Sequence, residues 1–188
     1  MMPLMTTHLT RASAPESVRI RPMTPDDGDA VAAIRVRGWR FAYRGTIPQA
    51  YLDTMDVAAE AEKQRARLAA GDGSLVNLVA EAADGTLAGW AAYGPYRDGG
   101  TRTDDGELYA LYLTPERIGQ GVGRALMAEV KERCAAAGYP RVFLWVFESN
   151  ARARRFYEAA GFTPDGTEEP FEVAGVQVPE VRYVHGPR

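Results

Sequence analysis

A glycine-rich turn is the part of this 188-residue sequence whose residue types and spacing point most directly to chemistry. It is the segment 117–124, Arg-Ile-Gly-Gln-Gly-Val-Gly-Arg, and it lies between an apolar run and a helical pattern. Glycines let the backbone turn tightly and bring successive N–H groups close to a ligand. The helix that follows adds unpaired N–H donors and the positive end of its dipole. The segment therefore predicts an anion site suited to a phosphate or pyrophosphate.

Two better-known phosphate-binding loops do not fit this turn. A Walker loop has Gly-Lys followed by Ser or Thr, whereas Gly123 is followed by Arg-Ala. A dinucleotide fingerprint has a third glycine three residues after the second. Counting from Gly119 gives Arg124, and counting from Gly121 gives Leu126. A plain tight turn that caps a helix remains the alternative interpretation.

The composition excludes several other classes of protein. Apolar residues make up 46% and charged residues 25%, the usual globular mix, which excludes disorder, a fibrous repeat and a coiled coil. A net charge of −3 disfavours general nucleic-acid binding. The single cysteine, Cys134, allows no intramolecular disulfide and no thiolate metal cluster, and the two histidines lie near the termini, which disfavours a zinc site or a Ser–His–Asp triad.

No apolar run approaches the roughly 20 residues that a membrane-spanning helix needs. The first ten residues form a poor secretion signal, because they lack a charged leading segment and a long apolar core. We therefore expect a cytoplasmic protein with neither a membrane nor a nucleic acid as partner.

The elements that must position the glycine turn alternate between strand and helix patterns. Strand patterns cover 18–21, 74–81, 87–93, 107–113 and 142–147, and a hairpin is expected over 167–185. Helical patterns cover about 26–39, 48–55, 58–70, 124–137 and 150–160, and a Gly/Asp/Thr-rich loop is expected over 98–106. We expect residues 1–16 to form a flexible tail and residues 17–188 to form one α/β domain.

Two segments in the second half of the chain carry a family resemblance. The run 111–126, LYLTPERIGQGVGRAL, closely resembles the acetyl-CoA-binding segment of the GCN5-related N-acetyltransferase (GNAT) family. The run 150–162, NARARRFYEAAGF, resembles the second signature of the same family, and a helix and a strand separate the two, as the family's order requires. One position departs from the family pattern: Ile118 stands where Gln or Arg is usual, and Arg117 or Arg124 would have to supply charge instead.

The resemblance implies the GNAT fold, an α/β (α+β) architecture. Its central sheet is mixed, mostly antiparallel, with about six to seven strands flanked by about four helices. The sheet is splayed between the strands that hold Leu111 and Trp145, and the gap admits the pantetheine arm of acetyl-CoA as an added strand would enter. The resemblance implies acetyl-CoA as co-substrate and no metal, with cofactor contacts from Leu111, Tyr112, Leu113, Ile118, Gly119, Gln120, Gly121, Val122, Gly123, Arg124 and Asn150.

Some of these residues have a structural interpretation as well. Leu111 and Leu113 would also serve as core leucines, since the contacts expected of them are main-chain contacts. Asn150 would be equally at home as a plain helix cap.

The resemblance also implies two catalytic residues. Glu107 matches the glutamate that several members of the family use as a base, often through water, although a glutamate at a strand start is otherwise usually a solvated charge. Tyr157 matches the tyrosine that protonates the departing thiolate of CoA; its other role would be to pack against the sheet. A phenol with a pKa near 10 is protonated at neutral pH and can therefore donate to sulfur. Cys134 is expected to be a packing residue, which favours direct transfer over an acyl-enzyme.

The acceptor side carries a weaker signal. Trp39, Tyr43 and Tyr109, together with Tyr93 and Tyr96, would form an aromatic cage for an amine, or else belong to the core or to a dimer interface. The acidic residues of the 98–106 loop would favour a cationic acceptor if that loop folded over the cleft; otherwise the loop is simply an acidic surface.

The sequence thus predicts an N-acetyltransferase that moves an acetyl group from acetyl-CoA to a primary amine of a small molecule, by direct attack in a ternary complex. Two alternatives stay open: acetylation of a protein or peptide amine, and a non-catalytic acyl-CoA sensor. Paired chains are common in the family, so a homodimer is compatible with the resemblance.

Overall fold

The computed structural model describes residues 17–186, so the tail predicted for residues 1–16 lies outside the described residues. The strands are β1 (Arg19–Pro22), β2 (Val76–Glu81), β3 (Leu87–Asp98), β4 (Thr101–Leu113), β5 (Val142–Phe147), β6 (Thr163–Val173) and β7 (Val176–His185). The helices are α1 (Gly28–Ala42), α2 (Gln49–Thr54), α3 (Val57–Ala70), α4 (Val122–Ala136) and α5 (Ala151–Ala159), with 3₁₀ turns at Pro25–Asp27 and Pro115–Arg117.

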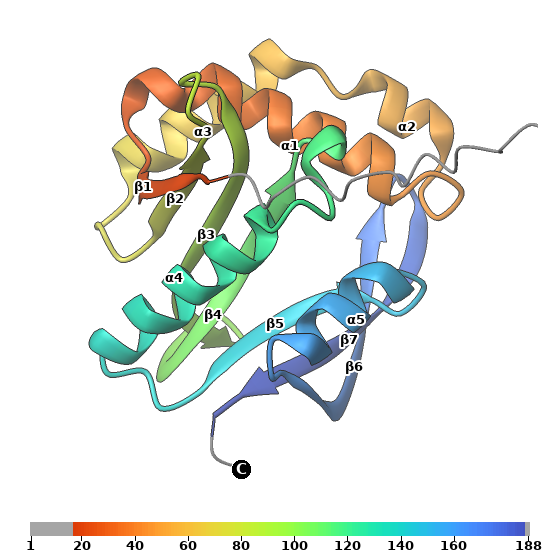
Figure 1. Cartoon of the computed structure of the whole chain (residues 1–188). Helices are drawn as coiled ribbons and strands as arrows, with labels where there is room; N and C mark the ends of the chain where they lie inside the picture. The colour runs from red at the N-terminus through yellow and green to blue at the C-terminus, as the bar shows by residue number, and fades with distance from the viewer. Residues whose placement is uncertain (1–16, 187–188) are drawn as a thin grey trace, which may run out of the picture.

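The seven strands form one sheet in the order β1-β2-β3-β4-β5-β7-β6. Every neighbouring pair is antiparallel except β4 and β5, which run parallel. These two strands pair only at Gly106 with Val142 and at Glu107 with Phe143. Beyond that point they diverge, as Figure 1 shows for the green and cyan strands. The sheet is therefore mixed, mostly antiparallel and splayed between the strands of Leu111 and Trp145, which confirms the predicted fold class.

Helices cover both faces of this sheet (Figure 1). The larger core lies under α4 and α5, where Leu126 and Val130 pack with Leu144 and Tyr183 of the strands. On the other face, Val31 and Ile34 of α1 pack against Val79, Trp90 and Ala92. A third cluster joins the end of α1 and α2 to β5, β6 and β7. No helix in the described part of the chain is long and apolar enough to cross a membrane.

Leu126 gives a direct test of the core on the α4 face. Its side chain is fully buried, and removal of a buried leucine side chain leaves a cavity that the surroundings fill only in part. We expect Leu126→Ala to lower the free energy of unfolding by about 2–5 kcal/mol in urea denaturation. Leu68→Ala on α3, where the side chain is 39% exposed, is the control and should change it by no more than about 0.5 kcal/mol.

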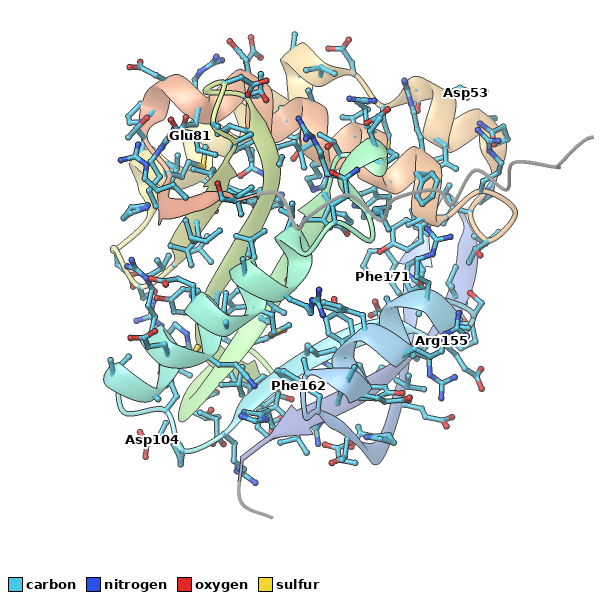
Figure 2. All side chains as sticks on the ribbon, viewed as in Figure 1. Asp53, Glu81, Asp104, Arg155, Phe162 and Phe171 are labelled. Atoms are coloured by element: carbon cyan, nitrogen blue, oxygen red, sulfur yellow. The ribbon has the colours of Figure 1, made fainter. Side chains whose placement is uncertain are left out.

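The prediction of a loop over residues 98–106 is wrong. The chain turns tightly at Gly99 and Gly100, both at positive φ, and β4 begins at Thr101. Asp105 lies inside β4, where it is buried and accepts two hydrogen bonds from the Arg141 guanidinium at 3.0 and 2.6 Å. These polar residues lack the apolar alternation that predicts a strand. They form one nevertheless, because the ion pair with Arg141 compensates the burial of the Asp105 carboxylate. Asp104 lies at the lower end of the sheet, where β4 and β5 meet, so no acidic loop folds over the split (Figure 2).

Candidate functional site

A cavity of about 740 Å³ opens where β4 and β5 diverge. Its walls come from the end of α1, the second half of β4, the glycine turn, β5, the start of α5 and one residue of β7. From Leu108 onward β4 is paired on its β3 side only, so the N–H and C=O groups on its other edge face the gap. An open strand edge of this kind can pair with an extended ligand through main-chain hydrogen bonds. Leu111, Tyr112 and Leu113 all line the cavity.

The glycine turn forms one wall of this cavity. Gly119 and Gly121 have φ of 84° and 91°, a region in which a side chain is strained, and Gly121 is the N-cap of α4. Because the first N–H groups of a helix have no partner within it, the turn presents unpaired donors beside Gly123 and Arg124. Ile118 also lines the cavity.

Two residues predicted from the same turn do not line the cavity. The side-chain amide of Gln120 donates to the Glu116 carbonyl at 2.6 Å, and Val122 is fully buried in the core. The main-chain groups of both residues remain beside the cavity.

Three tyrosines meet around the gap from different elements. Tyr157 projects from α5, Tyr112 belongs to β4, and Tyr43 follows α1; all three line the cavity. The hydroxyls of Tyr43 and Tyr112 lie 3.3 Å apart. Burial raises the pKa of each phenol above its usual value, and the neighbouring phenols add to the rise for Tyr43 and Tyr157. All three phenols therefore keep their protons at neutral pH, and Tyr157 can act only as a proton donor there.

Two carboxylates lie on the sheet face opposite α4 and α5. Glu107 pairs with Phe143 in the last rung before the split, and Glu180 of β7 pairs with Phe147. Residues directly opposite one another, and residues two apart on one strand, point to the same face. Burial raises the pKa of each carboxyl to about 7, and the charge of Glu180 adds to the rise in the pKa of Glu107. Both can thus exchange a proton near neutral pH.

Glu180 is the residue that the sequence analysis missed. Glu180 lines the cavity, whereas Glu107, the predicted base, is not among the residues that line it. The sequence offers no motif for Glu180, since it lies in an ordinary strand pattern near the end of the chain. Only the register of β7 on β5 brings it to the split.

The predicted aromatic cage is only partly assembled. Tyr43 and Tyr109 line the cavity, and the Tyr109 hydroxyl donates to the Pro95 carbonyl. Trp39 does not line it: the indole is buried behind Tyr43, with ring centroids 5.0 Å apart in an edge-on contact. Tyr93 and Tyr96 are likewise buried elsewhere.

The start of α5 borders the mouth of the cavity near the glycine turn. Asn150 lines the cavity, and its side-chain oxygen accepts a hydrogen bond from the Ala153 N–H at 3.2 Å, so it also caps the helix. The Arg152 guanidinium lies over the Phe41 ring at 5.1 Å, and both residues line the cavity. Arg155 points away from the sheet on the outer side of α5 (Figure 2).

Other reactive groups lie away from the site. Burial raises the pKa of the Cys134 thiol to about 12, so this cysteine is not a nucleophile at neutral pH. His185 Nδ1 lies 3.0 Å from the Gly161 carbonyl at the far end of β7. Within residues 17–186, no group of three or more His, Cys, Asp or Glu side chains is placed to hold a metal ion.

An open mixed sheet that splits between two parallel strands beside a glycine-rich helix start defines the acetyltransferase class of α/β proteins. A family model described as the acetyltransferase (GNAT) family matches residues 38–162. The chain belongs to this family, and it is an acetyltransferase.

Individual relatives agree with this assignment. The chain is 36% identical to the uncharacterized N-acetyltransferase YuaI of Bacillus subtilis (strain 168) over 165 residues, which is 87% of this chain and 90% of that protein. Among solved structures it is similar to the PaiA N-acetyltransferase of Thermoplasma acidophilum in complex with coenzyme A, with a TM-score of 0.67, 22% identity and coverage of 87% and 98% of the two chains. It is also similar to yncA of Salmonella typhimurium, a putative acetyltransferase with its cofactor acetyl-CoA, with a TM-score of 0.67, 21% identity and coverage of 90% and 94%.

Proposed function

We propose that this chain, through a single domain of residues 17–188, transfers an acetyl group from acetyl-CoA to a primary amine of a small molecule. The observation that carries the proposal is the cavity at the split in the sheet. It joins a wall of unpaired helix N–H groups on the α4 face to the Glu180 carboxylate on the opposite face. A phosphate-bearing donor and a cationic acceptor would therefore enter from opposite faces and meet in the gap.

The donor side has the features that acetyl-CoA requires. The glycine turn and the start of α4 suit its pyrophosphate. The open edge of β4 suits its pantetheine amides. Two structural neighbours are complexes with coenzyme A or acetyl-CoA, which supports the same ligand here.

The reaction follows from the groups around the gap. The amine nitrogen attacks the thioester carbonyl carbon, so an N–C bond forms and the C–S bond breaks. An alkylammonium with a pKa near 10.4 must first lose a proton, and Glu107 accepts it through water because Glu107 does not itself line the cavity. Tyr157 donates its phenolic proton to the CoA thiolate and regains one from solvent. After attack the nitrogen loses its second proton to solvent, so the net products are the acetamide, CoA thiol and one proton.

A contact at the rim of the cavity favours a small acceptor over a protein. The Thr46 hydroxyl, between α1 and α2, lies 3.4 Å from the Ser149 hydroxyl, which follows β5. This contact joins the segment after α1 to the segment after β5, near the position where Phe147 pairs with Glu180. A substrate chain that must thread beneath this contact is disfavoured relative to a small amine.

The test is mass-spectrometric detection of acetylated product, with the purified chain, acetyl-CoA and a panel of amino acids, diamines, aminoglycosides and short peptides. The proposal predicts acetylation of small amines ahead of peptides. Acetylation of peptides alone would replace the small-molecule acceptor. Binding of acetyl-CoA without any product would indicate the sensor, and failure to bind acetyl-CoA would refute the proposal as a whole.

The glycine turn can be tested separately from the chemistry. At Gly121, with φ of 91°, a branched side chain is strained and would turn the N–H groups away from the pyrophosphate. We expect Gly121→Val to weaken acetyl-CoA binding by about tenfold or more, measured by calorimetry. Gly85→Val is the matched control: it has a similar φ of 83° in a distant hairpin, so it should lower stability and leave acetyl-CoA affinity unchanged.

A further inference from the structure

Glu180 is a carboxylate without a protein partner. It forms no hydrogen bond or ion pair with another described residue, and the charge that affects it is the like charge of Glu169, which faces it from β6. Arg182, two positions further along the same strand, is engaged instead by Asp165 at 2.7 Å. A half-buried carboxylate left unpaired is costly to keep, and such groups concentrate where a ligand completes the site.

The charges along the cavity are separated by sign. Of the described residues that line it, three carry a charge: Arg124 at the start of α4, Arg152 at the start of α5, and Glu180. The two arginines lie beside the glycine turn and the helix starts, on the side proposed for the CoA phosphates. Glu180 lies on the opposite face of the sheet, where the acceptor enters. The acceptor side of the cavity therefore carries an uncompensated negative charge.

Glu180 and Glu107 are separated along the sheet. They pair with Phe147 and Phe143 of β5, four residues apart, which is about 13 Å along the strand. The rings of Phe147 and Tyr43 lie 4.6 Å apart and both line the cavity beside Glu180. An apolar wall next to a carboxylate suits a methylene chain that ends in an ammonium.

We propose that Glu180 binds a second cationic group of the acceptor, so that the preferred substrates of this enzyme are diamines. The inference rests on the acetyl transfer proposed above and names its acceptor class. The reacting nitrogen lies in the gap, where it gives its proton toward Glu107. The non-reacting ammonium lies at Glu180, with the intervening carbons against Phe147 and Tyr43. Glu180 is thus a specificity-determining residue and takes no proton in the reaction.

The proposal carries a pH dependence for diamine binding. Burial and the facing Glu169 hold the pKa of Glu180 at about 7, and the other titratable groups that face it, Glu107, Tyr43 and Tyr112, supply no cation. A raised carboxyl pKa means that Glu180 is mostly neutral at pH 6 and ionised at pH 8. Diamine affinity should rise roughly tenfold over that interval. Glu169→Gln removes the like charge and should move the rise to lower pH.

The test compares three acceptors that have four carbon atoms each and differ in charge: 1,4-diaminobutane, butan-1-amine and 4-aminobutanoate. Wild-type kcat/KM should favour the diamine over the monoamine by about 10- to 100-fold, with the aminocarboxylate last. Glu180→Gln should abolish this order, mainly through KM. Glu180→Asp keeps the charge and should retain part of it. Glu172→Gln, an exposed position on β6, is the control and should keep the full preference.

Three results would overturn the proposal. These are a wild-type enzyme that does not distinguish the three amines, a Glu180→Gln variant that keeps the preference, and a variant that loses kcat equally on all three. The same comparison is made by calorimetric binding of the diamine and the monoamine in the presence of coenzyme A. If no amine is acetylated at all, the proposed function fails, and the binding preference and its loss in Glu180→Gln still decide the role of Glu180.

Discussion

Replacement of Tyr157 by phenylalanine is expected to lower kcat by about 100-fold while acetyl-CoA affinity stays within about twofold. The reason is that the phenol is buried, stays protonated because its pKa is raised, and has no hydrogen-bond partner among the described residues. It is therefore free to donate to a thiolate in the gap. Phenylalanine keeps the ring contacts with Phe156 and Phe162 and removes only the donor.

Steady-state kinetics with a responsive amine, together with calorimetric titration of acetyl-CoA, check this expectation. Tyr183→Phe is the matched control, because Tyr183 is also a buried tyrosine on the α5 side and does not line the cavity. Its hydroxyl accepts from Arg154 at 3.0 Å and donates to Glu158 at 2.8 Å, so the control should lose stability and keep turnover. Wild-type kcat in Tyr157→Phe would remove this residue from the mechanism.

Glu107→Gln is expected to lower kcat by about 10- to 100-fold at pH 8 and to change the acidic limb of the pH profile. Burial raises the pKa of this carboxyl to about 7, so in the wild-type enzyme the base becomes protonated, and kcat falls, as the pH drops below about 7. Without the carboxyl, attack depends on the small fraction of free amine. The limb then flattens or moves upward toward the pKa of the amine itself.

The measurement is kcat against pH at saturating acceptor, which separates Glu107 from Glu180. In the saturated complex Glu180 is held ionised by the bound ammonium. Glu180→Gln should therefore keep the acidic limb of the wild-type kcat profile, and its effect should appear as a raised KM for the diamine. An unchanged profile in Glu107→Gln would assign the proton to another residue or to water alone.

Much of the fold could be predicted from the sequence, because its elements are local. Periodicity located the seven strands and five helices, and glycines such as Gly138 and Gly161 marked where helices stop. The failure at 98–106 has a physical cause. β4 continues there through polar residues because Asp105 pairs with Arg141, which lies 36 positions later in the chain. No local sequence pattern predicts such a long-range pair.

The candidate site divides in the same way. The glycine turn and Tyr157 belong to contiguous motifs, so their residues could be named, and most of them line the cavity. Glu180 and the aromatic wall depend on the register of β7 on β5 and on where α1 packs, which are long-range properties. Trp39 was predicted from its aromatic type and its place between the first two helices, and the structure places it behind Tyr43.

The central claim is that the split between β4 and β5 is where acetyl-CoA and the acceptor meet. A crystal structure of the chain with coenzyme A tests it most directly. The account predicts pantetheine amides paired with the open edge of β4 at Leu111 and Leu113, the pyrophosphate at Gly119–Gly123, and the sulfur within hydrogen-bond distance of the Tyr157 hydroxyl. Coenzyme A bound outside the gap, or a sulfur remote from Tyr157, would contradict it.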